Sequence, residues 1–208
     1  MRNRQHVNVN AVAFETFTGD MPTIEPGRIV ELEIGCADAQ FLFERAQVDP
    51  SRTYIGLEIR EPLVKAVNRN AREQNLPVQA VFVHASHHLD KLLAPGSVRH
   101  CYLNFPDPWF KRKHHDRRMI NEALVRKLAP LIEPGGDVFI QSDVFEVALD
   151  AMMVFETCDD VFENMRGPWT FWKEGNPFGV RSWREMNCED NDMPVWRMRY
   201  VPRSLTAK

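Results

Sequence analysis

The fold is decided by a short stretch near the start of the chain, Arg28-Ile29-Val30-Glu31-Leu32-Glu33-Ile34-Gly35. Its branched and apolar residues predict a β-strand over 28–34, and Gly35 marks the end of that strand. Residues 37–47 then predict a helix with Asp38 near its start. The stretch therefore begins a strand–loop–helix unit, the building block of a parallel sheet.

The same alternation of strands and helices continues along the chain. Further strands are predicted over 53–57, 78–84, 98–105 and 137–141, and further helices over 62–74, 87–93, 117–132 and 144–155. The turn residues Pro134-Gly135-Gly136 should end the helix over 117–132. Because crossovers between parallel strands are right-handed, this order predicts an α/β fold with a doubly wound, mostly parallel sheet and helices on both faces.

The two ends of the chain depart from this pattern. Residues 1–27 are polar and irregular, so they are predicted to be an N-terminal extension, with residues 28–208 forming a single domain. Residues 181–203 predict two strands around a turn at 187–194. Such an antiparallel hairpin at the sheet edge would bring the sheet to seven strands.

The composition is that of an ordinary globular protein. The 208 residues are 44% hydrophobic and 26% charged, with a net charge of -3, so a nucleic-acid partner would have to meet a local cluster of positive charge. No run of ~20 apolar residues is present, so no membrane span is predicted, and no secretory signal follows Arg2 and Arg4.

Cysteine and histidine spacing gives no metal site. The scattered cysteines predict a reduced, cytoplasmic location; they are Cys36, Cys101, Cys158 and Cys188. The pairs His87-His88 and His114-His115 lack partners at a spacing that would hold a metal ion, so no metal is predicted.

A rigid acidic loop followed by a dense basic run is the most informative motif. It spans Asn104-Phe105-Pro106-Asp107-Pro108-Trp109-Phe110-Lys111-Arg112-Lys113-His114-His115-Asp116-Arg117-Arg118. The two prolines restrict the backbone around Asp107. Residues 111–118 hold five Lys or Arg against one Asp. A constrained acid beside such a patch indicates chemistry on a polyanion, whereas the plain structural interpretation is a rigid loop before a solvated helix.

This block resembles the signature of the bacterial tRNA (guanine-N7-)-methyltransferases, in which Pro-Asp-Pro-Trp precedes a Lys/Arg-rich segment and paired arginines. The resemblance implies a class I, Rossmann-like methyltransferase. It also implies methyl transfer from S-adenosylmethionine to N7 of a guanine in tRNA, in the variable loop. The partner would be tRNA, the N-terminal extension would be a further candidate for RNA contact, and the sequence leaves monomer and homodimer open.

The expected donor site lies at the carboxyl ends of the strands, where doubly wound sheets bind ligands. Residues 31–39 resemble the first methyltransferase motif, with Ala37 and Ala39 in place of two glycines. Glu58 ends the second strand 23 residues after Gly35, a spacing that suits a carboxylate binding ribose hydroxyls. The alternative for Glu58 is a first-turn acid facing Arg60 or Lys65. The predicted cofactor-binding residues are Glu33, Gly35, Ala37, Glu58, Ile59, Ala85, Ser86, Asn104 and Asp107.

Guanine N7 carries a lone pair in the neutral base, so the reaction needs alignment and charge stabilisation rather than a general base. Asp107 is the predicted catalytic residue, a carboxylate that would accept hydrogen bonds from the guanine and stabilise its developing positive charge. The resemblance gives it a further role at the amino group of the methyl donor. Residues 182–185 resemble the family's Thr-x-x-Glu substrate motif. The predicted substrate-binding residues are Lys111, Asp143, Ser182, Trp183, Arg184 and Glu185. Two alternatives stay open: a related methyltransferase with another RNA or small-molecule substrate, and an RNA-binding protein with degraded catalysis.

Overall fold

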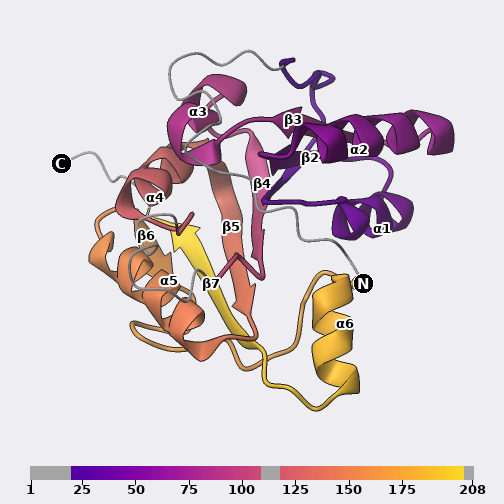
Figure 1. Ribbon diagram of the computed structural model, residues 1–208. Helices are drawn as coiled ribbons and strands as arrows, with labels where there is room; N and C mark the ends of the chain where they lie inside the picture. The colour runs from indigo at the N-terminus through magenta and orange to yellow at the C-terminus, as the bar shows by residue number, and fades with distance from the viewer. Residues whose placement is uncertain (1–19, 109–117, 204–208) are drawn as a thin grey trace.

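A computed structural model describes residues 20–108 and 118–203 and shows a mixed sheet flanked by helices (Figure 1). Within these residues the sheet has seven strands in the order β3-β2-β1-β4-β5-β7-β6. The strands are β1 (Val30–Ile34), β2 (Thr53–Glu58), β3 (Val78–Phe82), β4 (Val98–Asn104), β5 (Ile132–Ser142), β6 (Phe162–Asn164) and β7 (Trp196–Pro202). The first five strands run parallel, and β7 pairs antiparallel with both β5 and β6. The predicted doubly wound sheet with an antiparallel edge is confirmed.

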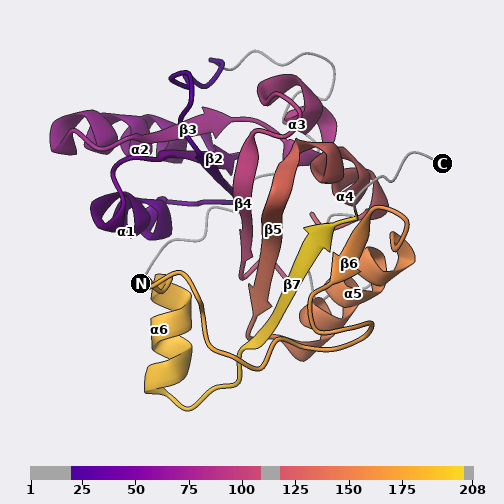
Figure 2. The ribbon, with the colours of Figure 1, turned by 180° about the vertical axis from the view of Figure 1, so that it is seen from behind.

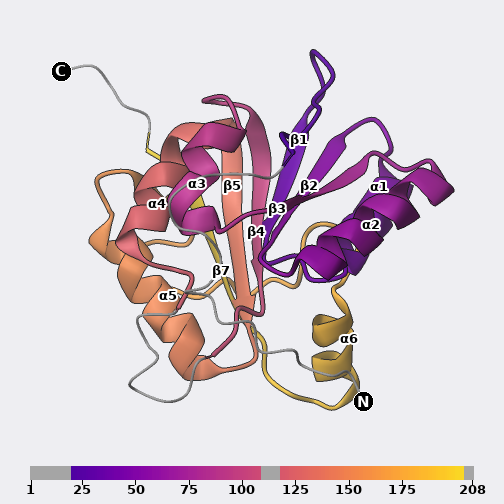
Figure 3. The same cartoon turned by 45° about the horizontal axis from the view of Figure 1, so that its top comes forward.

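Helices cover both faces of the sheet, as Figure 3 shows with α3, α4 and α5 on one side and α1 and α2 on the other. The helices are α1 (Gln40–Val48), α2 (Glu61–Gln74), α3 (Ala85–Leu92), α4 (Glu122–Leu128), the 3-10 turn η3 (Ala129–Leu131), α5 (Phe145–Thr157) and α6 (Trp183–Asp190). No helix in the described ranges is long and apolar enough to cross a membrane.

The predicted long helix over 117–132 was wrong in its length. Residue 117 lies outside the described residues, α4 spans only Glu122–Leu128, and β5 already begins at Ile132. The Pro134-Gly135-Gly136 run therefore lies inside β5 rather than ending a helix. Gly136 allows β4 and β5 to approach closely, because a Cβ there would lie 2.6 Å from the Arg99 carbonyl oxygen.

The predicted terminal hairpin was also placed wrongly. Residues 183–190 form helix α6 because the Ser182 hydroxyl caps its start, accepting a 3.2 Å hydrogen bond from the Glu185 backbone N–H. The antiparallel neighbours of β7 are β5 and the short β6, which the sequence analysis did not predict as a strand. Figure 2 shows β4, β5 and β7 side by side, with α6 beyond the end of β7.

The two faces of the sheet differ in chemistry. Leu32, Leu103 and Ile140 belong to a large apolar core with α3, α4 and α5. The alternate residues of the same strands point to the other face and include buried polar groups, among them Glu31, Glu33, Asp137 and Gln141. This second face, called the polar face below, is covered by α1, α2 and the segment around Phe178.

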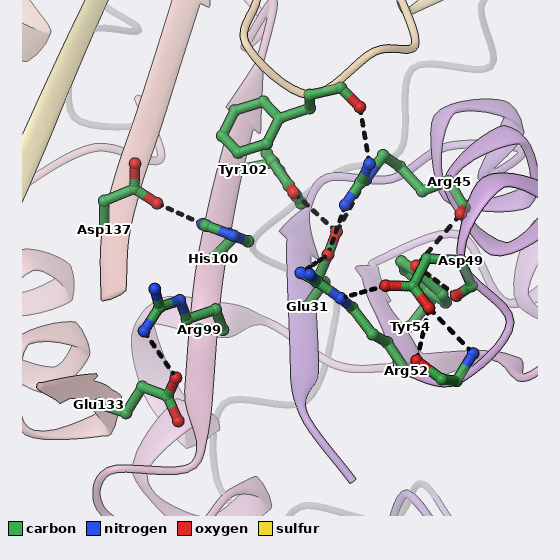
Figure 4. A network of polar contacts seen from close by, with 12 residues as sticks. Glu31, Arg45, Asp49, Arg52, Tyr54, Arg99, His100, Tyr102, Glu133 and Asp137 are labelled. Atoms are coloured by element: carbon green, nitrogen blue, oxygen red, sulfur yellow. Dashed lines mark hydrogen bonds and ion pairs between the residues drawn. The ribbon is translucent and has the colours of Figure 1, made fainter. Parts of the chain in front are cut away.

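A buried network holds the polar face together (Figure 4). Glu31 accepts hydrogen bonds from Arg45 at 2.6 and 3.0 Å, from Arg52 at 2.6 Å and from Tyr102 at 2.7 Å. Burial alone would raise the pKa of Glu31, but these hydrogen bonds and the Arg45 charge outweigh it and the pKa is lowered. Arg45 also donates to the Phe178 carbonyl at 2.6 Å, which ties residues far along the chain to β1.

Candidate active site

The loop after β1 is strained where the sequence lacks glycine. Gly35 has φ +80°, and Ala37 and Ala39 also lie in the left-handed region with φ 53° and 54°. An L-residue with a Cβ pays roughly 1–2 kcal/mol for this conformation. The loop packs tightly on β2, because a Cβ at Gly56 would lie 2.4 Å from Cys36 Sγ. Strain that persists at a strand end is characteristic of ligand-binding loops.

Glu58, the last residue of β2, holds this loop in place through hydrogen bonds. Its carboxylate accepts hydrogen bonds from the backbone N–H groups of Ala37 (3.0 Å) and Ile59 (2.8 Å). It also forms an ion pair with Arg60 at 2.7 Å, so the alternative in which Glu58 faces Arg60 describes the present structure. Glu58 is 3% exposed at the predicted donor edge. Contact with ribose hydroxyls stays a prediction and would require Arg60 to share or release the carboxylate.

Glu33, near the end of β1, is a buried acid with only one of its two side-chain oxygens hydrogen-bonded to a described residue. Asn104 Nδ2 donates to its Oε1 at 2.8 Å, whereas its buried Oε2 has no protein hydrogen-bond partner within the described residues. Burial raises the pKa of Glu33 to about 8, and the charges of Asp38 and Glu58 add to the rise. Such a carboxyl is suited to a cationic or hydrogen-bond-donating ligand, which would satisfy the remaining oxygen.

Residues 85 and 86 open α3 directly after β3. Ala85 is 6% exposed, and the Ser86 hydroxyl is buried without a protein hydrogen-bond partner in the part of the chain described. The β3 end lies against β2, since the Val83 N–H donates to the Glu58 carbonyl at 3.1 Å. The Ser86 hydroxyl is therefore available to a donor adenine, which supports the prediction for Ser86 without testing it.

Asp107 lies in the Pro-Asp-Pro loop beyond β4 and is exposed. The loop begins with a strained residue, Phe105, at φ 48°. The Phe105 N–H donates to the Gln141 carbonyl at 2.8 Å and fixes the loop against β5. The pKa of Arg60 is raised mainly by Glu58 and also by the charge of Asp107, so Asp107 lies near the Glu58–Arg60 pair.

The predicted substrate residues lie at the end of β5 and at the start of α6. Asp143 and Arg184 form an ion pair, with Arg184 Nε 3.0 Å from an Asp143 oxygen. Ser182 caps α6, and Trp183 is 49% exposed beside this pair. The pairing brings two of the predicted residues together, while Lys111 lies outside the described residues.

Glu185 has a different environment from that expected of a substrate ligand. It is fully buried and accepts hydrogen bonds from Arg197 (2.7 Å), Gln141 (3.2 Å) and Asn176 (2.8 Å). Direct contact with a base would require one of these donors to move. Within the described residues Glu185 therefore holds α6 on the sheet.

Sequence reasoning missed Gln141, Asn176 and Arg197, whereas Arg60 was named only as an alternative partner of Glu58. The signal that could have found Gln141 is the alternation of polar and apolar residues in β1, β4 and β5, because central parallel strands are usually apolar throughout. Asn176 and Arg197 carry no comparable local signal. No group of His, Cys, Asp and Glu that could hold a metal ion occurs among the described residues.

The architecture and the donor edge together define a class I methyltransferase fold. A methylase of ribosomal RNA from Streptococcus thermophilus matches with a TM-score of 0.53 at 11% identity, covering 85% of this chain and 88% of that one. A precorrin-6y C5,15-methyltransferase from Geobacter metallireducens matches with a TM-score of 0.54 at 14% identity, covering 84% and 80%. At these identities the likeness concerns the fold.

Sequence comparison identifies the family. The family described as "Putative methyltransferase" matches residues 27–198. The tRNA (guanine-N(7)-)-methyltransferase of Thermosynechococcus vestitus is 38% identical over 96% of this chain and 94% of the relative. The enzyme of the same name from Synechococcus elongatus is 36% identical over 97% and 96%. The chain belongs to the tRNA (guanine-N(7)-)-methyltransferase family and is an S-adenosylmethionine-dependent methyltransferase.

Proposed function

We propose that this protein methylates N7 of a guanine in tRNA. The observation that carries the proposal is the convergence of Glu33, Glu58 and Asn104 at the carboxyl ends of adjacent strands, next to the strained loop of Ala37. The sequence relatives, which align over nearly the whole chain, bear the name of this activity. Glu33 Oε2 and the Ser86 hydroxyl are buried without hydrogen-bond partners among the described residues, which fits a methyl donor that brings hydrogen-bond donors and acceptors.

The chemistry asks the protein for positioning. S-adenosylmethionine supplies an electrophilic methyl group on a sulfonium, and the guanine N7 lone pair is a nucleophile without losing a proton. Holding the reacting atoms in line can contribute about 7–11 kcal/mol. Positive charge develops on guanine during the reaction, and the exposed carboxylate of Asp107, in the loop after β4, would stabilise that charge.

The charge distribution supports a tRNA partner. The chain holds 26 Lys and Arg against 29 Asp and Glu, and residues 1–19, 109–117 and 204–208 contain seven of the basic and two of the acidic residues. That leaves 19 basic and 27 acidic residues elsewhere. Several remaining arginines, including Arg60, Arg184 and Arg197, are already paired with acids. Phosphate contacts are therefore expected from the block that begins at Lys111 and from the N-terminal extension.

The test is methyl transfer from labelled S-adenosylmethionine to tRNA transcripts, followed by chemical cleavage at 7-methylguanosine. A matched transcript made with 7-deazaguanosine keeps the base-pairing edge but lacks N7, so it should accept no methyl group. Methylation of the 7-deaza transcript would show that the methylated atom is not guanine N7. Absence of methylation in both transcripts would favour an RNA-binding protein without this activity.

The Asp107→Asn variant separates catalysis from binding. It keeps the shape of the loop and removes the charge, so we expect turnover to fall by at least tenfold with tRNA affinity within threefold. Normal turnover would leave Asp107 a purely structural role.

A further inference from the structure

A continuous chain of side-chain hydrogen bonds joins the donor edge to α6. Asn104 donates to Glu33 at 2.8 Å, and Gln141 donates to Asn104 Oδ1 at 2.9 Å. The same Gln141 nitrogen donates to Glu185 Oε2 at 3.2 Å. The chain crosses β1, β4 and β5 at neighbouring positions, since Asn104 pairs with Gln141 across the sheet.

The direction of every bond in this hydrogen-bond chain is fixed at its Glu185 end. Glu185 and the Gln141 Oε1 both accept from Arg197, so the Gln141 nitrogen must face Glu185 and Asn104 Oδ1, and the Asn104 nitrogen must face Glu33. Gln141 is fully buried, its nitrogen donates to both Asn104 and Glu185, and its Oε1 accepts from Arg197 Nε at 3.3 Å. Reversing either amide would leave buried donors facing each other, which is costly in a low-dielectric interior.

The two ends of this hydrogen-bond chain lie at the predicted sites of two different ligands, the methyl donor and the tRNA. Glu33 lies near the carboxyl end of β1, at the predicted donor edge, and its buried Oε2 has no hydrogen-bond partner among the residues that the structure describes. Glu185 fastens the first turn of α6, where Ser182, Trp183 and Arg184 precede it. Asn176 adds a second tether from the segment before α6, donating to Glu185 at 2.8 Å. Three hydrogen bonds therefore connect Glu33 to Glu185 in the first turn of α6.

We propose that Gln141 is a positioning residue that couples donor binding at Glu33 to tRNA binding at the start of α6. The inference rests on the proposed function and adds a means by which the two substrates favour each other's binding. Because Gln141 has one satisfied orientation, the geometry that suits a bound donor also fixes Glu185. Coupling of this kind is reciprocal: tRNA raises donor affinity by the factor by which the donor raises tRNA affinity.

The experiment measures that factor by calorimetric titration with S-adenosylhomocysteine, in the absence and presence of saturating tRNA transcript. For the native protein we expect tRNA to tighten S-adenosylhomocysteine binding at least fivefold. In Gln141→Leu the factor should fall below twofold, with each ligand alone binding within threefold of the native protein.

The matched control is Asn68→Leu. Asn68 also has a partly buried amide with two hydrogen bonds, to the Ala80 carbonyl and N–H at 2.8 and 2.7 Å, but it joins α2 to β3 outside the chain described above. Its variant should lose comparable stability and keep the native coupling factor. Equal loss of coupling in both variants would overturn the proposal, because general loosening would then explain the result.

A second variant keeps the test decisive if Gln141→Leu does not fold. Gln141→Glu preserves the shape and the acceptor for Arg197 but replaces the donor to Glu185 and Asn104. Relative to the native protein measured at the same pH, coupling should be lost at pH 8 and partly return at pH 6, where the protonated side chain at position 141 regains one donor; the native reference accounts for the protonation of Glu33 in this range. A native coupling factor in a folded variant at pH 8, or no coupling in a native protein that methylates tRNA, overturns the inference alone. Failure of the native protein to methylate tRNA overturns the proposed function.

Discussion

The two faces of the sheet share the same strands but are stabilised in opposite ways. On the apolar face, Leu32 and Leu103 gain stability from burial alone, which is non-directional and tolerant of small shifts. On the polar face, burial removes the hydration of Glu31 and Glu33, and only hydrogen bonds of defined geometry offset the free-energy cost of that loss. The apolar face therefore supplies stability, and the polar face fixes the positions of the groups at the strand ends, where the predicted site residues lie.

The largest effect should come from breaking the centre of the polar face. Glu31→Ala removes the partner of the buried Arg45 and should cost about 3–5 kcal/mol in unfolding free energy measured in urea. Arg45→Ala should cost a similar amount, and the double variant should lose little more than either one, because the two side chains form one unit. Leu32→Ala, on the other face, should cost about 2–5 kcal/mol and add to Arg45→Ala. Additivity of Glu31 and Arg45 would contradict the comparison.

Glu33 sharpens the comparison through pH. Its pKa is raised to about 8 in the folded protein, compared with 4.5 for an ordinary Glu. Below pH 4.5 both states carry the proton. Between 4.5 and 8 the unfolded state releases it first, so the folded state loses up to about 1.4 kcal/mol of stability per pH unit, and above 8 the loss is complete.

Glu33→Gln should therefore stabilise the protein relative to the native chain by an amount that grows from pH 5 to pH 8. The measurement is the unfolding free energy of both proteins at pH 5, 6.5 and 8. The exposed Glu73 provides the matched control, since Glu73→Gln should shift stability by the same small amount at each pH. A pH-independent difference for Glu33→Gln would mean that Glu33 is already ionised in the folded protein.

Much of this arrangement was predictable, because it follows from order along the chain. Alternating strands and helices fix a parallel sheet, and the rule for strand ends then places Glu58 and Asp107 on one edge. The structure confirms the sheet and places Glu58 against the loop of Ala37. Glu33 was predicted as a cofactor-binding residue, whereas the burial of Glu31 and its bonds to Arg45, Arg52 and Tyr102 were not predicted.

The rest depends on contacts between distant residues. Residues 183–190 form a helix because Ser182 caps its start, which is a local signal, and because Arg197, 12 residues after Glu185, pairs with that acid. The Arg197 pairing lies outside a short window of neighbouring residues. The same holds for the Asp143–Arg184 pair, which joins residues 41 apart.

Variants of Glu58 test whether this carboxylate binds the methyl donor in addition to holding the loop after β1. Glu58→Ala should weaken S-adenosylhomocysteine binding by about 1.5 kcal/mol, roughly tenfold in Kd, because it removes a charged hydrogen-bond acceptor. Arg60→Ala is the control, since it keeps the carboxylate and removes only its ion-pair partner. Calorimetry should show a change of under threefold for Arg60→Ala. Equal weakening in both variants would assign the effect to the ion pair rather than to the carboxylate.

The smallest effect should arise at the strained loop that ends β1. Ala37 has φ 53° and is half-buried, so Ala37→Gly relieves roughly 1–2 kcal/mol of backbone strain. Glycine also raises the conformational entropy of the unfolded chain, which destabilises the folded protein by about 0.4–1 kcal/mol and leaves a net stabilisation of about 0.5–1 kcal/mol. Ala39 shares the conformation but is fully buried, so losing its methyl offsets the relief and Ala39→Gly should be nearly neutral. Ala46→Gly, inside α1, is the control and should destabilise by more than about 1 kcal/mol, because it loses helix propensity and a fully buried methyl group without relieving strain. Thermal unfolding of the three variants would contradict the strain argument if Ala37→Gly lowered Tm as Ala46→Gly does.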